Sequence, residues 1–318
     1  MPPKLRRQKV ALGQPLKTLR KKQRAGISLN ALKPSTIKKY NYALNLFFSW
    51  LPGSRYCDLE SLVDLDEAVV AYVNVCWEEG EQIDDAANVL SGLCHYILPI
   101  RGHLNGSWKM ISRWRQKELP AQAPPMGLAV LTLMIGTALE CKRLPLAAGI
   151  ALAFHCFLRT GELFALHCGD VQVGEKGGAV VLQHTKKGIR DIVSINDPLV
   201  LTLVKMRLLH SSAGDWFCDI PAAKARCIFA DFLKALDLSH LGLRWYSLRR
   251  GGATHHFCKF GQMESTLVRG RWESSRTARI YLTEGMAALQ ETSLEDWQIQ
   301  LAAHFAKILV ECGSGSGF

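Results

Sequence analysis

The sequence predicts a mainly α-helical protein with one small antiparallel β-sheet, divided into two folded domains. Apolar residues recur at spacings of three and four along most of the chain after residue 30, which is typical of helices. A proline-rich stretch at 118–126 interrupts that pattern on both sides and indicates a linker. Two runs of β-forming residues, 180–184 and 189–195, flank the turn 185–188 and indicate a hairpin in the second domain.

The chain begins with a strongly basic segment. No Asp or Glu precedes Asp58, whereas thirteen Lys and Arg do, and the 26 basic residues that follow face 28 acidic ones. Residues 58–318 therefore carry a formal charge of −2, and the excess behind the total of +11 is N-terminal. We expect residues 1–29 to be a disordered basic arm suited to phosphate contact. A solubility tail and a nuclear-import signal are the alternatives.

Residues 30–117 are predicted to form a small helical domain. One face of its first helix is marked by residues at spacings of 4, 4, 3 and 3, namely Thr36, Tyr40, Leu44, Phe47 and Trp50. Ser35 or Thr36 is the expected N-cap of this helix. Further helical patterns lie at 65–79, 82–96 and 107–117.

Residues 127–312 are predicted to form the larger second domain. It begins with two strongly apolar helices, 127–139 and 144–158. Neither approaches the roughly 20 residues of a membrane span, so we expect no membrane partner. Later helices are expected at 198–210, 222–236, 246–260 and 284–310, and residues 313–318 are expected to be a flexible tail.

Four polar residues spread over the second domain are the ones needed to cut a phosphodiester without a metal. The planar guanidinium groups of Arg159 and Arg249 match two phosphate oxygens at once and stay charged at any working pH. The phenol oxygen of Tyr281 is the candidate nucleophile, since its attack gives a covalent phosphotyrosine and splits one difficult step into two transesterifications. A lysine from the turn, Lys186 or Lys187, is the candidate general acid for the departing sugar oxygen.

This ordered set resembles the tyrosine recombinases, the family of Cre, Xer and lambda integrase. Arg159 and Glu162 match the family's first motif in the segment Phe-Leu-Arg-Thr-Gly-Glu-Leu, and Arg249 matches its second arginine in Ser-Leu-Arg-Arg-Gly-Gly-Ala. Trp272 and Tyr281 stand nine residues apart, as the family pattern requires. The resemblance covers nearly everything from about residue 30 to the Tyr281 region, and it implies a helical core-binding (SAM-like) domain followed by a tyrosine recombinase catalytic domain.

The resemblance also implies the roles of the remaining site residues. Aligning 192–195 with the family's outgoing strand places Lys186 at the catalytic position, with Lys187 as the alternative. Glu162 would support Arg159. Tyr246 stands where the family usually has His, and with an unperturbed pKa of about 10 it is a poor proton shuttle near neutrality. Trp272 can only donate a hydrogen bond, so the motifs show no base for the nucleophile.

By resemblance, then, the chain is expected to be a site-specific DNA recombinase or integrase that cleaves and rejoins double-stranded DNA through a 3′-phosphotyrosine. It is expected to act as a homo-oligomer, a tetramer, on paired sites. No metal, ATP or small-molecule cofactor is implied. A eukaryotic mobile-element member is the favoured origin. Further candidates for DNA contact are Lys38, Lys39, Arg250 and Arg276. The alternatives are a DNA-binding protein of the same fold that has lost turnover, a type IB topoisomerase-like enzyme, and a helical scaffold in which these residues coincide by chance.

The ten cysteines form no Cys-x-x-Cys pair, which favours reduced thiols and hence an intracellular setting, the nucleus if the source is eukaryotic. His255, His256 and Cys258 lie close together in the sequence, but on one helix they lack the spacing of a tetrahedral zinc site. We therefore expect no metal there.

Overall fold

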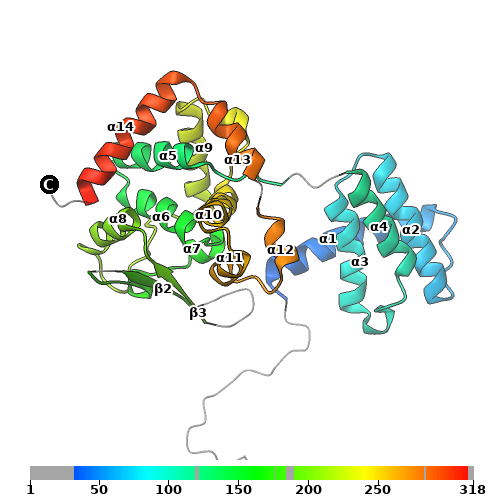
Figure 1. Ribbon diagram of the computed structural model, residues 1–318. Helices are drawn as coiled ribbons and strands as arrows, with labels where there is room; N and C mark the ends of the chain where they lie inside the picture. Colours follow the sequence, from blue (N-terminus) through cyan, green and yellow to red (C-terminus); the bar gives the residue numbers. More distant parts are fainter. Residues whose placement is uncertain (1–31, 119–121, 176, 184–189, 283, 314–318) are drawn as a thin grey trace, which may run out of the picture. The chain divides into compact units, whose positions relative to one another are not determined.

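The computed structural model describes residues 32–118, 122–175, 177–183, 190–282 and 284–313. The chain divides into two compact units, Met1–Pro120 and Ala121–Phe318 (Figure 1). The predicted basic arm at 1–29 and residues 314–318 of the predicted tail lie outside the described residues, whereas Gly313, predicted to begin the tail, ends the last helix.

The first unit is a bundle of helices. They are α1 (Pro34–Trp50), α2 (Leu62–Glu78), α3 (Ile83–Tyr96) and α4 (Asn105–Lys117), with short 3-10 turns at Leu51–Gly53 and Leu98–Ile100. Helix α1 packs on α3, and α2 packs on α4. The core between them contains Phe47, Leu90 and Ile111, all fully buried.

Helices α1, α2 and α4 begin earlier than the sequence predicted, and for α1 and α2 the residues at their N-termini explain the difference. The expectation of a cap at Ser35 or Thr36 is wrong: α1 begins at Pro34, after Lys33 in the N-cap position, and no side chain caps it. Proline suits a first helical position because its fixed φ is already helical and its missing N–H would have had no partner there. Helix α2 begins at Leu62 because Ser61 and Asp64 form a capping box.

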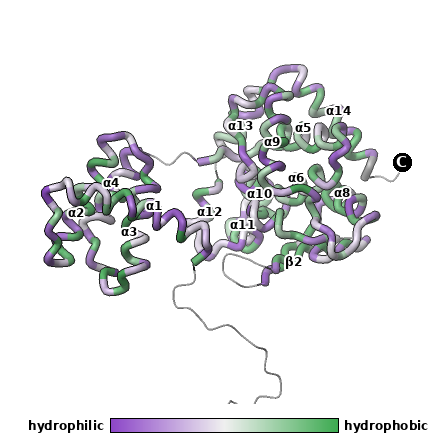
Figure 2. Tube along the Cα trace, turned by 180° about the vertical axis from the view of Figure 1, so that it is seen from behind, coloured by the Kyte–Doolittle hydropathy of each residue, from purple (hydrophilic) through white to green (hydrophobic). Residues whose placement is uncertain are grey.

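The second unit is built around α6 (Leu144–His155), whose residues from Leu146 to Phe154 are all buried. Helices α5 (Leu128–Glu140), α8 (Pro198–Leu208) and α10 (Trp245–Phe260) pack against it, and α9 (Ala222–Ala235) lies on α5. Figure 2 shows how the apolar residues follow α6 through this unit. The burial explains why the helix is apolar on all sides.

The described β-structure is one antiparallel sheet of order β1-β2-β3, formed by Val171–Val173, Gly178–Leu182 and Asp191–Ile195. The pairing of β2 with β3, with Val180 opposite Val193, confirms the predicted hairpin. Strand β2 ends before the predicted 184, and β3 begins after the predicted 189. Residues 184–189, which include Lys186 and Lys187, lie outside the described residues. Strand β1 was not predicted.

The C-terminal part contains α11 (Met263–Gly270), α12 (Ser275–Arg279), α13 (Glu284–Thr292) and α14 (Asp296–Gly313), and the short helix α7 (Thr160–Leu163) lies earlier in the chain. The prediction of a single helix at 284–310 is wrong, because the helix is interrupted between Thr292 and Asp296. Gln298 caps the second helix by accepting from the Glu295 N–H, and its amide donates to the Leu236 carbonyl. Helix α14 packs on α5 and α8 of its own unit. None of the described helices is long and apolar enough to cross a membrane.

Candidate active site

Four segments of the second unit bring the predicted site residues together. Arg159 immediately precedes α7, and Tyr246 and Arg249 lie in the first turns of α10. Trp272 follows α11, and Tyr281 follows α12. Lys186 and Lys187 are outside the described residues, so the general acid stays a prediction.

Tyr281 is half-buried in the middle of this group. Its hydroxyl lies 2.6 Å from the hydroxyl of Tyr246, and the centroids of its ring and the Trp272 ring are 4.5 Å apart. Its main-chain carbonyl accepts a hydrogen bond from the Thr254 hydroxyl, 3.1 Å away. Tyr281 is therefore held against α10 through both its side chain and its backbone.

The two phenols differ in acidity. Burial raises the pKa of Tyr246 to about 12, with a further contribution from its hydrogen bond to Tyr281. Burial also acts to raise the pKa of Tyr281, but the hydrogen bond from Tyr246 and the positive charges of Arg249 and Arg159 outweigh it, and this pKa falls below its usual value. Either hydroxyl can donate in this hydrogen bond, and the difference in pKa favours Tyr246 as the donor. Tyr246, which stands where the family usually has His, therefore bonds the candidate nucleophile in the structure.

Arg249 has no exposed surface at all, which is unusual for an arginine. It donates one hydrogen bond to the Phe157 carbonyl and another, of 2.8 Å, to the Gly270 carbonyl. The guanidinium carbon lies 4.9 Å from the centroid of the Trp272 ring and 5.5 Å from that of Tyr281. Burial lowers the pKa of Arg249 to about 10, with help from nearby arginines, so it remains charged at neutral pH.

Two glycines allow the close packing around Arg249. A Cβ atom at Gly252 would lie 1.9 Å from the Phe154 carbonyl oxygen, so α10 can approach the end of α6 only with glycine there. A Cβ atom at Gly270 would lie 2.1 Å from the Trp272 ring. The first glycine belongs to the Ser-Leu-Arg-Arg-Gly-Gly-Ala motif, and the second stands two residues before Trp272, so these motifs also contain packing information.

Glu162 joins Arg159 to an arginine that the sequence analysis missed. Arg159 Nη1 lies 2.5 Å from Glu162 Oε1, and the Arg159 main-chain N–H donates to Oε2 over 2.8 Å. Arg271 Nη2 also donates to Oε2, over 2.8 Å, and to the Phe157 carbonyl, over 3.1 Å. The only sequence signal for Arg271 is its position beside Trp272. Its role depends on contacts with residues more than a hundred positions earlier in the chain.

The group contains more positive charge and more hydrogen-bond donors than it can satisfy internally. Among its described residues, three guanidinium groups face one carboxylate, a formal charge of +2. Buried N–H groups without an acceptor are Nε of Arg249, Nε and Nη1 of Arg271, and Nε1 of Trp272. Buried donors normally have partners, so a group with several spare ones is suited to an anion.

Comparison with solved structures gives matches over most of the chain. A lambda integrase dimer bound to a COC′ core site is similar with a TM-score of 0.57 and 17% identity, covering 81% of this chain and 74% of that one. The Tn1549 transposon integrase, in complex with circular intermediate DNA, is similar with a TM-score of 0.55 and 12% identity. The match covers 81% of this chain and 99% of that one. The chain has the tyrosine recombinase fold. The XerH site-specific recombinase bound to difH substrate matches it with a TM-score of 0.53 and 16% identity, over 84% of this chain and 78% of that one.

Other comparisons add nothing to this result. No family model matches the sequence, and no match is found among curated proteins. The likeness to the tyrosine recombinase fold therefore rests on three-dimensional structure, at 11–17% sequence identity.

The predicted DNA contacts on this recombinase fold fall into two groups. Lys38 and Lys39 on α1 and Arg276 on α12 are exposed. Arg250 is only 3% exposed, and its Nη1 donates to Gln122 Oε1 over 2.5 Å, so this guanidinium is already bonded within the protein. The bond ties α10 to the segment before α5.

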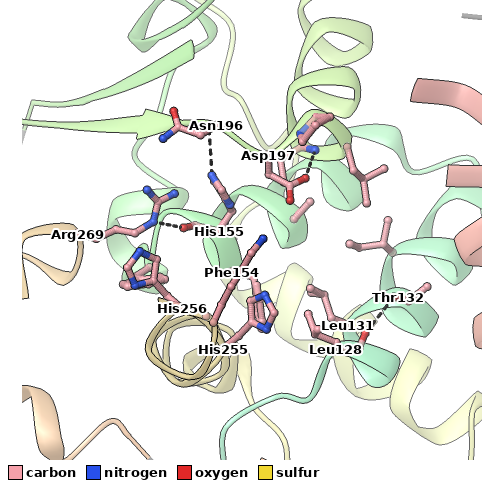
Figure 3. A pocket seen from close by; sticks show the side chains of 18 of the residues that line it. Leu128, Leu131, Thr132, Phe154, His155, Asn196, Asp197, His255, His256 and Arg269 are labelled. Carbon is pink, nitrogen blue, oxygen red and sulfur yellow. Dashed lines mark hydrogen bonds between the residues drawn. The ribbon is translucent and has the colours of Figure 1, made fainter. Parts of the chain in front are cut away.

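A cavity of about 330 Å³, with Phe157 in its lining, lies between α5, α6, α8 and α10 (Figure 3). His155, His255, His256 and Arg269 line its polar part. His155 Nε2 accepts from the Asn196 N–H, and Arg269 donates to the His155 carbonyl (Figure 3). Among the described residues, no buried donor without a partner lines this cavity, and no group of metal-binding side chains is present.

Proposed function

We propose that the chain is a site-specific DNA recombinase or integrase that cleaves and rejoins DNA through a 3′-phosphotyrosine on Tyr281. The observation that carries this proposal is the position of Tyr281 against Arg249, in a group with a formal charge of +2 and several spare buried donors. The fold supports it, since the similar structures include integrases and recombinases bound to DNA.

In the proposed cleavage step, the Tyr281 oxygen forms a bond to phosphorus while the bond from phosphorus to the 5′ oxygen breaks. Arg159 and Arg249 bind the non-bridging oxygens, on which negative charge increases in the transition state. Lys186 gives a proton to the leaving 5′ oxygen. Attack by a 5′ hydroxyl on the phosphotyrosine reverses the step, so the phosphodiester energy is kept and no ATP is needed.

A phosphate cannot reach Arg249 in the arrangement described, because the rings of Tyr281 and Trp272 cover the guanidinium. We infer that the Tyr281 ring moves aside when DNA binds. This movement breaks the hydrogen bond with Tyr246, and the Tyr246 hydroxyl becomes free to donate to a phosphate oxygen. Tyr246 would then hold the nucleophile before cleavage and the phosphate during it.

The partners proposed are double-stranded DNA and further copies of the same chain. Among similar structures, lambda integrase is bound to a core site as a dimer and to a Holliday junction as a tetramer. We propose a tetramer on paired sites for this chain as well. Complete recombination of two duplexes requires four cleavages, one in each of the four strands.

The test is covalent trapping. The protein is incubated with a pooled library of nicked duplexes, whose short cleaved strand diffuses away, and denaturation-resistant protein–DNA adducts are collected. The expected result is an adduct that is lost in Tyr281→Phe. Because the hydroxyls of Tyr246 and Tyr281 are 2.6 Å apart, Tyr246→Phe is the matched control and should keep the adduct. An adduct on Tyr246, identified by peptide mapping, would overturn the assignment of the nucleophile.

A second candidate is a DNA-binding protein of this fold without turnover. Two observations favour it: Tyr246 replaces the expected His and has a pKa near 12, and Arg249 is fully buried. This candidate predicts salt-sensitive DNA binding without an adduct, and cleavage restored by Tyr246→His. A type IB topoisomerase-like enzyme is separated by its ability to relax supercoiled DNA without paired sites, whereas a recombinase should give joined products only from paired sites.

A further inference from the structure

We propose that Arg271 is a positioning residue that aligns both phosphate-binding arginines, a role that rests on the proposed function. Arg271 contacts the carboxylate that holds Arg159 and the carbonyl that holds Arg249. Its side chain is only 9% exposed, so it acts from behind the phosphate site rather than on DNA. It belongs to none of the motifs that predicted the site.

The first link runs through Glu162. One oxygen of this carboxylate binds Arg159, and the other binds Arg271. Without Arg271, the pair of Arg159 and Glu162 would be formally neutral, and much of the attraction of Arg159 for a phosphate would be cancelled. With Arg271 the trio carries a charge of +1. Arg271 thus lets Glu162 orient Arg159 without neutralising it.

The second link runs through the main chain of Phe157. Its carbonyl accepts hydrogen bonds from both Arg249 and Arg271. Phe157 has a φ of +48°, a left-handed conformation that is uncommon for a residue other than glycine and that persists only when its surroundings enforce it. The buried ring of Phe157 and the two guanidinium groups supply that constraint. Removing Arg271 would loosen the carbonyl on which the position of Arg249 depends.

The third link is to the nucleophile segment. Arg271 itself is left-handed, with a φ of +56°, and closes the C-terminus of α11 through its own N–H. The next residue is Trp272, whose ring lies against Tyr281 and over Arg249. The turn at Arg271 therefore directs its side chain to Glu162 while the following residue packs on the nucleophile. One residue connects the segment of Tyr281 to the segment of Arg159.

A purely structural role would not require these features. Burying an arginine is costly, and apolar residues of similar volume often give equal or greater stability. Arg271 nevertheless keeps Nε and Nη1 buried without acceptors. The cost is understandable if the charge and the two-pronged geometry serve the proposed reaction.

The experiment is single-turnover adduct formation on a nicked duplex selected with the wild-type protein, measured over a range of protein concentrations. For Arg271→Ala we expect the maximal rate to fall about 30- to 100-fold, because small misplacements of catalytic groups have effects of this size. The half-saturating protein concentration should change less than about threefold. Arg271→Lys keeps the charge but not the fork, so an intermediate loss of about tenfold is expected. If Arg271→Ala does not fold, the rate of Arg271→Lys tests the positioning role by itself.

The matched control is Arg207→Ala. Arg207 also donates to main-chain carbonyls, those of Trp216 and Phe217, but has no contact with the site. Its loss should lower the melting temperature and leave the rate within about twofold of the wild type. In combination with Glu162→Gln, the Arg271→Ala change should have a smaller effect than it has alone, because the part that acts on Arg159 runs through the same carboxylate and only the part that acts through the Phe157 carbonyl remains.

The outcomes separate this inference from the function on which it rests. Wild-type protein that forms no adduct would overturn the proposed reaction and the role of Arg271 with it. Adduct formation by the wild type and an Arg271→Ala rate within threefold of it would overturn the positioning role alone. So would a defect confined to the half-saturating concentration, which would mean that Arg271 binds DNA, or full additivity with Glu162→Gln.

Discussion

Arg159 and Arg249 have the same proposed task, yet the protein holds them in different ways. Arg159 has 30% of its side chain exposed and is anchored by the carboxylate of Glu162. Arg249 has none exposed and is anchored by two main-chain carbonyls, those of Phe157 and Gly270. A carboxylate anchor subtracts a charge, whereas a carbonyl anchor does not.

The difference indicates an order of events. In the proposed reaction, the partly exposed Arg159 would make the first contact with a phosphate. Arg249 would become accessible only after the Tyr281 ring moves off its guanidinium, so its charge would be presented as the nucleophile moves. The two arginines should therefore differ in how much they contribute to folding and how much to binding.

The largest expected effect comes from Arg249→Ala. The change leaves the Gly270 carbonyl without its donor and opens a cavity under Trp272, so the free energy of unfolding should fall by about 3 kcal/mol. Adduct formation should fall by about 10³-fold or more, since a main charge-stabilising group is lost. Urea denaturation and the trapping assay measure the two. A variant as stable as the wild type would mean that burial of Arg249 is not a structural requirement.

Glu162→Gln should have the next largest effect. The amide has the size of the carboxylate, but its NH₂ faces guanidinium donors and the charge between Arg159 and Arg271 is lost. The side chain is only 5% exposed, and breaking a buried pair of this kind costs about 2 to 3 kcal/mol. Urea denaturation is again the measurement. Glu295→Gln, on a carboxylate outside this group, is the control and should change stability by less than about 0.5 kcal/mol.

Arg159→Ala should separate folding from function most clearly. Its partly exposed ion pair contributes less than about 1 kcal/mol of stability, and Glu162 keeps Arg271 as a partner. Adduct formation should nevertheless fall about 10²-fold. Equal losses of stability in Arg159→Ala and Arg249→Ala would remove the distinction between the two arginines.

The smallest expected effect is a change in pH dependence, from Tyr246→Phe. The hydrogen bond from Tyr246 lowers the pKa of Tyr281, so its loss should raise that pKa. The phenolate is the attacking species, so the second-order rate constant of adduct formation, which reports groups of the protein before DNA binds, rises with pH through this pKa. The rising part of the profile should therefore move to higher pH, with little change in melting temperature. A shift to lower pH would mean that Tyr246 is not the donor of the pair.

Much of this fold could be predicted because the signals are local. The apolar α6 and the β2–β3 hairpin follow from short patterns. Strand β1 is only three residues long and forms by pairing with β2, so its sequence has no periodicity to detect. The break at Ser293 was missed for a similar reason, since the cap that starts α14 depends on Gln298, whose amide also contacts a distant carbonyl.

The site shows the same division. Motif order predicted that Arg159, Arg249, Trp272 and Tyr281 would come together, and the structure places them in one group. Arg271 could not be predicted, since its role arises from a left-handed turn and a contact across 109 residues of sequence. The burial of Arg250 could not be predicted, because the sequence does not reveal which side of α10 faces the interior.

The carbonyl of Phe157 has an evolutionary consequence. Every side-chain anchor in the site can be lost through a single base change, but a main-chain oxygen is encoded at every position and no substitution deletes it. The carbonyl contacts that hold Arg249 are thus protected against point mutation, provided that the backbone keeps its conformation at Phe157 and Gly252. Among related sequences that no longer require the site, substitutions should remove the side chain of Glu162 first, while the main-chain contacts around Arg249 should persist longer.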